Sequence, residues 1–142
     1  AGVRLLVVGE GRDLDRCVAR SGPGVEFLGR LPRAEMRELV RGARALVMPG
    51  EEDFGIVPVE AMAAGTPVLA LGRGGAVDTV VPGVSGELVE GSDDDEVIAA
   101  FAEAMRRWDD SAYPASALAR FAADFSEESF RSRIAAVVDR VV

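Results

Sequence analysis

The chain has 142 residues and contains no histidine, lysine, asparagine or glutamine, and only one cysteine. Without histidine, the usual zinc ligand sets cannot be built, and most of the common catalytic side chains are missing. A single cysteine excludes an internal disulfide. Any chemistry in this chain must therefore rest largely on carboxylates, arginine and backbone amides.

The charge balance is acidic, with a net charge of −8 from 24 acidic residues and 16 arginines. Nucleic acids and anionic membranes bind basic surfaces, so we expect no nucleic-acid partner. No apolar run reaches the roughly 18 residues that a membrane span needs. The first residues form a charged strand pattern rather than a signal peptide. We therefore expect a cytoplasmic protein.

Short apolar runs alternate with helical patterns along most of the chain. The predicted strands are residues 5–8, 25–28, 45–48, 67–71 and 86–89, and the predicted helices between them are 13–20, 32–43, 58–64 and 76–81. From Ser92 onward only helical patterns follow. Apolar strands that are each followed by a helix are typical of a parallel sheet covered on both faces. We predict one α/β domain of residues 1–142, a Rossmann-like parallel sheet with a helical C-terminal tail.

Three features outside the loops have structural interpretations. Cys17 lies in a helical stretch, and we expect a small core or half-buried residue rather than a reactive thiol. The acidic run 92–96 is expected to cap a helix and supply its first-turn charge rather than to bind a cation. Near the C-terminus, one apolar stripe is expected to pack in the core, with a docking face as the alternative. It consists of Ile134, Val137, Val138 and Val141.

The segment 50–60 is the most informative, because two carboxylates, Glu52 and Glu60, lie on either side of a seven-residue spacer. Gly55 allows a sharp turn and a close approach to a ligand, and Pro58 suits the first position of a helix. The amides at such a helix start favour an anion. The helix dipole contributes only about 0.3–1 kcal/mol, so a diphosphate would need further cations.

The two carboxylates differ in whether a purely structural role could explain them. Glu60 is expected in the first turn of the helix, where it could simply cap the helix. Glu52 lies in a loop with two neighbouring acids, Glu51 and Asp53, that repel it. A structural explanation is therefore available for Glu60 and not for Glu52.

Two other loops follow predicted strands. Residues 9–11 read Gly-Glu-Gly, but a dinucleotide fingerprint needs a third glycine where this chain has Leu14, so we predict a tight turn. Residues 72–75 read Gly-Arg-Gly-Gly, which fits either an anion-binding backbone nest that includes Arg73 or a flexible turn.

The stretch from Glu52 to Val68 resembles the nucleotide-sugar site of the GT-B glycosyltransferases of family 4 (group 1), retaining enzymes that share a Glu-x7-Glu motif. The resemblance continues through residues 74–80 and 83–89. Residues 25–29 are similar to the family's third-strand signature, and those from Phe125 onward to its closing helix. This resemblance implies that the chain is the donor-binding half of a GT-B fold, similar to a bacterial mannosyltransferase-like branch.

The resemblance also implies roles for single residues. Glu52, the implied catalytic residue, would orient hydroxyls of the transferred sugar rather than attack it. Glu60 would accept hydrogen bonds from the ribose of the nucleotide. The other implied donor-binding residues are Phe54, Gly55, Ile56 and Val57 at the sugar and distal phosphate, Arg30 and Leu31 beside the base, and Arg73 and Gly74 in the glycine loop.

By the same resemblance, the ligand is a nucleoside diphosphate sugar, with GDP-mannose favoured, and the acceptor is a sugar or a lipid-linked glycan. No cofactor and no metal are expected. The chain departs from the family at Asp78, where glutamate is usual, and the Arg and Lys that clamp the diphosphate would lie before position 1. We therefore expect a fragment that is inactive alone and whose partner is a missing N-terminal acceptor domain of the same enzyme.

The missing part would also contain the first strand of this domain, so the sheet would either have a gap or close in the order 2-1-3-4-5. The whole enzyme could bind peripherally at the inner membrane through the missing domain.

The alternative function is a non-enzymatic nucleotide-binding α/β module. A phosphoacceptor receiver domain is rejected, because Met48, Pro49 and Gly50 follow the third strand and no lysine exists.

Overall fold

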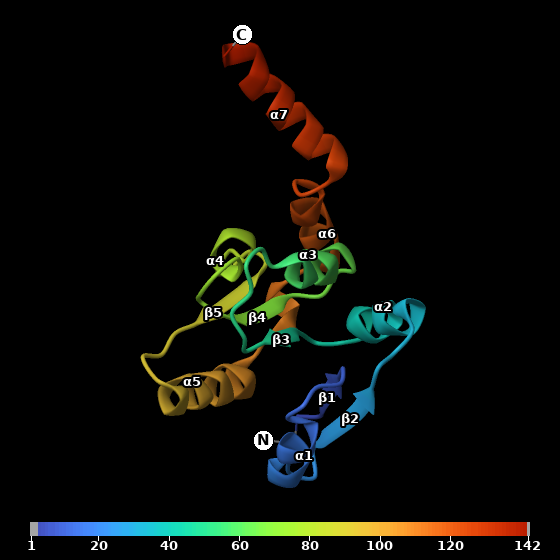
Figure 1. Cartoon of the computed structure of the whole chain (residues 1–142), viewed down its shortest axis with the longest axis vertical. Coiled ribbons are helices and arrows are strands. Elements are labelled where there is room, and N and C mark those ends of the chain that lie inside the picture. The colour runs from blue at the N-terminus through green and yellow to red at the C-terminus, as the bar shows by residue number, and fades with distance from the viewer. Residues whose placement is uncertain (1–2, 142) are drawn as a thin grey trace. The chain divides into compact units, whose positions relative to one another are not determined.

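The structure is a computed structural model that describes residues 3–141 (Figure 1). Its strands are β1 (Leu5–Val8), β2 (Val25–Gly29), β3 (Leu46–Met48), β4 (Val68–Leu71) and β5 (Gly86–Val89). Its helices are α1 (Leu14–Arg20), α2 (Arg33–Arg41), α3 (Ile56–Ala63), α4 (Ala76–Thr79), α5 (Asp94–Arg107), the 3-10 helix η1 (Asp110–Ala112), α6 (Ala115–Ala123) and α7 (Glu127–Val141). The chain divides into two compact units, Ala1–Leu39 and Val40–Val142.

The first unit contains the parallel pair β1 and β2, connected by α1. Leu5 lies opposite Val25, and the register shifts between Val7 and Val8. The residues of β1 are half-buried. The prediction for Cys17 was wrong, because its side chain is exposed on α1, a helix that buries none of its residues.

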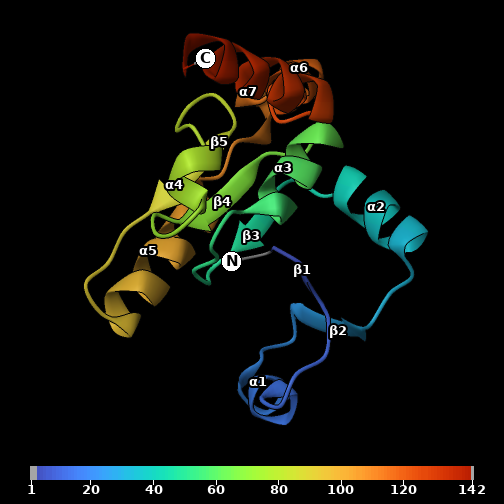
Figure 2. The same cartoon turned by 45° about the horizontal axis from the view of Figure 1, so that its top comes forward.

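The second unit is built on a parallel sheet in the order β3-β4-β5. The central strand β4 is buried along its whole length. Helices α3 and α4 lie on one side of this sheet and α5 on the other (Figures 1 and 2). The strands of the described residues thus pair as two parallel sheets, and not as one sheet in the order 2-1-3-4-5.

The hydrophobic core of the second unit gathers around β4, α3, α5 and α6. Its most buried large side chains are Met62, Val68, Leu69, Val80 and Leu118. At its edge, the rings of Trp108 and Tyr113 stack with centroids 5.4 Å apart. This core fixes the carboxyl ends of β3 and β4, from which the candidate site emerges.

Helix α3 begins earlier than predicted. Its first residue is Ile56, so Pro58 is the third helical residue and not the first. The cause is Gly55, which takes the left-handed conformation (φ 79°) and turns the chain into the helix two residues sooner. Proline is still tolerated there, because amides of the first helical turn have no intrahelical acceptor.

The apolar stripe of α7 does not pack in the core. Ile134, Val137 and Val138 are each about half exposed, and Figure 1 shows α7 extending beyond α6. The side chain of Val141, the fourth member of the stripe, lies outside the described residues. Within residues 3–141, no helix combines the length and the apolar composition of a membrane span.

Candidate functional site

The candidate site lies at the carboxyl ends of two neighbouring strands, β3 and β4. The chain leaves β3 at Met48, passes through the acidic loop and enters α3 at Ile56. It leaves β4 at Leu71 and reaches α4 through the glycine loop, residues 72–75. Because β3 and β4 run parallel, both loops emerge at the same edge of the sheet, where ligands of open α/β sheets bind.

The N-terminus of α3 is open. Its N-cap residue is Gly55, which has no side chain to cap the helix, and no acidic residue lies in its first turn. Pro58 has no N–H to donate, so the outward amides of this end are those of Ile56 and Val57. Such amides, together with the helix dipole, suit an anionic group.

Glu60 is the fifth residue of α3 and therefore lies beyond its first turn. The prediction that Glu60 lies in the first turn, where it could cap the helix, is thus wrong, because the helix begins at Ile56, two residues earlier than predicted. The side chain of Glu60 is exposed, on the opposite side from the buried residues Ala61 and Met62.

A hollow of about 390 Å³ lies beside this helix start and is lined by residues 51–56. It brings together four predicted site residues, Glu52, Phe54, Gly55 and Ile56. The side chain of Phe54 is 61% exposed although it is a large apolar group. Predicted residues Val57 and Glu60 follow directly on α3.

The glycine loop packs its backbone against the acidic loop. The Gly75 amide donates a hydrogen bond to the Glu52 carbonyl at 2.6 Å. A Cβ atom at position 75 would collide with the backbone of Phe54, so only glycine fits there. The two loops are therefore held together by main-chain contacts.

Both interpretations of the glycine loop were wrong in part. The amides of Gly72, Arg73 and Gly75 donate to the carbonyls of Val89, Leu71 and Glu52 respectively. With three of its four amides already bonded within the protein, the loop is neither a flexible turn nor a full anion-binding nest. The contact of Gly74 with the nucleotide sugar stays a prediction.

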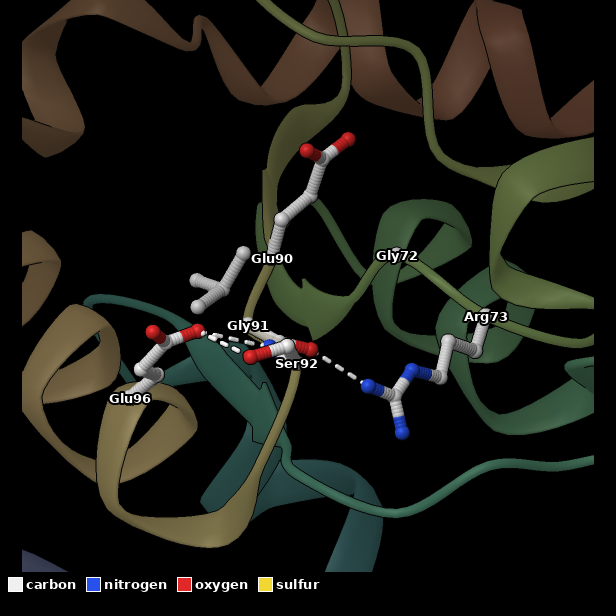
Figure 3. A pocket seen from close by; sticks show the side chains of 7 residues that line it. Gly72, Arg73, Glu90, Gly91, Ser92 and Glu96 are labelled. Atoms are coloured by element: carbon white, nitrogen blue, oxygen red, sulfur yellow. Dashed lines mark hydrogen bonds between the residues drawn. The ribbon is translucent and has the colours of Figure 1, made fainter.

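Arg73 turns away from the acidic loop. Its guanidinium donates a hydrogen bond to the carbonyl of Gly91, across a second hollow of about 570 Å³ at the ends of β4 and β5 (Figure 3). The arginine thus links the loops that follow these two strands. The contact of Arg73 with the nucleotide sugar stays a prediction.

The second hollow also contains the start of α5, where the sequence predicted a helix cap. The Asp93 carboxylate accepts a hydrogen bond from the Glu96 amide at 2.9 Å. Ser92 donates to the Glu96 carboxylate through its amide and its hydroxyl (Figure 3), and these bonds lower the pKa of Glu96. The capping prediction is confirmed, since the polar groups satisfy one another.

Arg30 and Leu31 follow β2 in the first unit, and their contact with the base of a nucleotide stays a prediction. Arg30 faces Glu10, with the guanidinium Nε 3.9 Å from a carboxylate oxygen. The Gly9 amide donates to the Gly29 carbonyl at 2.8 Å, which places the loops after β1 and β2 side by side. The sequence interpretation treated residues 9–11 only as a turn and missed this pairing.

The sequence interpretation also missed Thr79. Its hydroxyl is buried and donates to the Gly75 carbonyl at 3.0 Å, directly behind the acidic loop. A signal for it was present, because threonine four residues after a glycine at a helix start can bond back to that carbonyl. Within residues 3–141, no group of three acidic or cysteine side chains could hold a metal ion.

Comparison with known proteins places these features in context. The sequence profile of the family described as glycosyl transferases group 1 matches residues 1–108. The chain is 40% identical over 105 residues to a GDP-mannose-dependent monoacylated alpha-(1-6)-phosphatidylinositol monomannoside mannosyltransferase of Corynebacterium glutamicum, covering 66% of this chain and 27% of that protein. It is 38% identical over 117 residues to the D-inositol 3-phosphate glycosyltransferase of Streptomyces avermitilis, covering 80% and 24%.

Among solved structures, the chain is similar to the Anabaena protein HepE in complex with UDP. The TM-score is 0.72 with 27% sequence identity, over 97% of this chain and 41% of that one. The chain thus spans about a quarter of the length of the two curated relatives.

Proposed function

The chain belongs to the family of glycosyl transferases group 1 and has the fold of a GT-B domain, and we propose that it is the donor-binding domain of a retaining sugar transferase. The whole enzyme transfers a sugar from a nucleoside diphosphate sugar to an acceptor hydroxyl, with the anomeric configuration retained. The observation that carries this proposal is the open N-terminus of α3 directly beside the acidic loop.

The two halves of this site suit the two halves of the donor. A phosphate would be repelled by the acids of the hollow and attracted by the amides of Ile56 and Val57. The hydroxyls of a neutral sugar can donate to the Glu52 carboxylate without such repulsion. The diphosphate therefore lies over the helix start and the sugar lies against the acidic loop.

In this mechanism the protein stabilises the leaving diphosphate more than it supplies a nucleophile. Amides placed where negative charge develops lower the barrier, because they need no reorganisation during the reaction. Glu52 holds the sugar in the reactive orientation. Glu60, further along α3, accepts hydrogen bonds from the ribose, and Arg30 and Leu31 lie beside the base. Arg73 and Gly74 contribute to donor binding from the glycine loop.

The identity of the donor and acceptor is a narrower proposal. The GDP-mannose-dependent relative supports GDP-mannose as the donor. Its name and that of the inositol phosphate relative support a polyol, sugar or lipid-linked glycan as the acceptor. The acceptor is held by the rest of the enzyme, which acts in the cytoplasm and peripherally at the inner membrane. No metal or other cofactor takes part, because an arginine and a lysine from the rest of the enzyme, together with the amides of α3, meet the diphosphate charge.

Calorimetry on the full-length protein with GDP and with UDP tests the proposal. Replacing Glu60 with alanine removes a charged acceptor for the ribose, a hydrogen bond of roughly 1.5–3 kcal/mol, so nucleotide affinity falls about tenfold or more. In assays of transfer, the donor KM rises more than kcat falls. The matched control is Glu128→Ala, an exposed acid on α7.

Two results would contradict parts of this proposal. An unchanged donor KM in Glu60→Ala removes the ribose assignment. Tight nucleotide binding without any transfer or hydrolysis of a sugar nucleotide by the full-length protein favours the non-enzymatic binding module instead.

A further inference from the structure

Behind the acidic loop lies a buried polar group that the proposed reaction does not itself use. Thr79, the last residue of α4, is 1% exposed. Its hydroxyl donates to the carbonyl of Gly75 at 3.0 Å. In a core made mostly of apolar side chains, this hydroxyl is one of few buried polar groups, the others among the described residues being Thr66 and Ser85.

Thr79 and Glu52 are both hydrogen-bonded to the same residue, Gly75. Gly75 accepts the Thr79 hydroxyl through its carbonyl and donates its amide to the Glu52 carbonyl at 2.6 Å. The contacts form a continuous series from the α4 side chain, through Gly75, to the main chain of the predicted catalytic residue. Helix α4 has only four residues. Its Gly75 carbonyl is held by two bonds, the shorter from the Thr79 hydroxyl at 3.0 Å and the longer from the Asp78 amide at 3.3 Å.

Thr79 also meets the other end of the acidic loop. A Cβ atom at Gly55 would come within 2.9 Å of the Thr79 hydroxyl oxygen and within 3.3 Å of the Gly75 carbonyl oxygen. Gly55 is the N-cap of α3, so the same threonine packs where the amides of Ile56 and Val57 begin. One side chain therefore contacts the groups that set both halves of the site.

We propose that Thr79 is a positioning residue, which fixes Glu52 and the start of α3 in their reactive arrangement without touching the substrate. This inference rests on the role of Glu52 in the proposed function. The hydroxyl is needed, rather than only its volume, because it bonds the Gly75 carbonyl and so helps to hold Gly75, whose amide, in the preceding peptide group, donates to the Glu52 carbonyl. A displacement of about 1 Å at a reacting group can lower a rate by roughly a hundredfold.

The chain offers a matched control in Thr66. It is also 1% exposed, and its hydroxyl donates to the Val40 carbonyl at 2.6 Å. It lies before β4, at the amino end of the sheet and away from the acidic loop. A valine at either position removes a buried hydroxyl of the same kind, so the two variants differ in location rather than in chemistry.

The test measures kcat, donor KM and thermal unfolding for Thr79→Val, Thr79→Ser and Thr66→Val in the full-length enzyme. We expect Thr79→Val to lower kcat by about tenfold to a hundredfold, with a smaller change in donor KM. Thr79→Ser, which keeps the hydroxyl, restores most of kcat. Thr66→Val lowers the unfolding temperature to a similar extent and leaves kcat near that of the unchanged enzyme. If Thr79→Val does not fold, Thr79→Ala takes its place.

A double variant separates positioning from general destabilisation. If Thr79 acts through Glu52, then Thr79→Val lowers kcat little further in an enzyme that already carries Glu52→Gln. The inference is overturned if the losses of kcat from Thr79→Val and Glu52→Gln are additive in the double variant. It is also overturned if Thr66→Val and Thr79→Val lower kcat equally. A fully active Thr79→Val beside an inactive Glu52→Gln overturns it and leaves the proposed function intact. A fully active Glu52→Gln overturns both.

Discussion

Helices α3 and α5 start at the same edge of one parallel sheet, yet their N-termini are built in opposite ways. The first turn of α5 carries three acids, and the Asp93 carboxylate accepts from the Glu96 amide at 2.9 Å. The first turn of α3 carries no acid and has no side-chain cap. Each helix leaves amide donors at its start, and the N-cap side chain accepts from one of them at α5 but not at α3.

This difference separates a structural helix start from a functional one. A capped N-terminus gains stability, typically about 1 kcal/mol per cap, and has less capacity left for an anion. At α3 the protein forgoes that gain and places Gly55 at the cap position, where the left-handed conformation leaves the amides open. We infer that the larger of the two hollows, at α5, is structural, and the smaller one, at α3, is the site.

The largest expected effect comes from the acid beside the open helix. Replacing Glu52 with glutamine keeps the shape of the side chain and removes the charge that, in the proposed function, orients the sugar hydroxyls. We expect kcat to fall roughly a hundredfold or more, while nucleoside diphosphate still binds, because the proposed diphosphate contacts are with the amides of α3. Steady-state kinetics and calorimetry on the full-length enzyme measure the two quantities separately.

The control for this variant is Glu103→Gln, an exposed acid on α5 that pairs with Arg106. It should leave both kcat and nucleotide affinity unchanged. Near-normal transfer by Glu52→Gln would show that the acidic loop does not carry the reaction and that the open helix start was misinterpreted.

A smaller effect follows from making α3 resemble α5. Val57 is the second residue of α3 and is 41% exposed, and Asp95 is the second residue of α5. Val57→Asp adds a first-turn acid, which stabilises a helix by about 0.3–1 kcal/mol and repels a phosphate from the same amides. We expect nucleotide affinity to fall about tenfold without loss of thermal stability.

Val57→Thr, which has a similar shape and no charge, is the companion variant. If the aspartate and threonine variants bind nucleotide equally well, the start of α3 does not face the diphosphate.

The sequence predicted the alternation of β1–β5 and α1–α4 well, because apolar runs, prolines and glycines mark those elements locally. It misplaced the start of α3, since Pro58 is an equally good first or third helical residue and only the φ angle of Gly55 decides between them. It also predicted a buried α7 stripe, because spacing shows which residues share a face and not what covers that face.

In the candidate site, the sequence predicted the residues that line the hollow better than those that support them. Glu52, Phe54, Gly55 and Ile56 are neighbours in sequence and do line one hollow. The bond from Gly75 to Glu52 and the turn of Arg73 toward Gly91 join loops that are 18 or more residues apart. Such contacts depend on the register of β3, β4 and β5, which no local pattern in one sequence reports.

The smallest expected effect is at α5, where removal of a cap should change stability and nothing else. Asp93→Ala deletes the carboxylate that accepts from the Glu96 amide, so unfolding becomes easier by about 1 kcal/mol, or about 2–4 °C in a large domain. Thermal unfolding measures this loss, and Asp94→Ala, which removes a neighbouring acid without that bond, is the control. Nucleotide affinity should stay constant in both variants, because residues 51–56, and not the start of α5, line the hollow of the proposed site. A fall in nucleotide affinity in Asp93→Ala alone would place the diphosphate at α5 and reverse the assignment of the two helix starts.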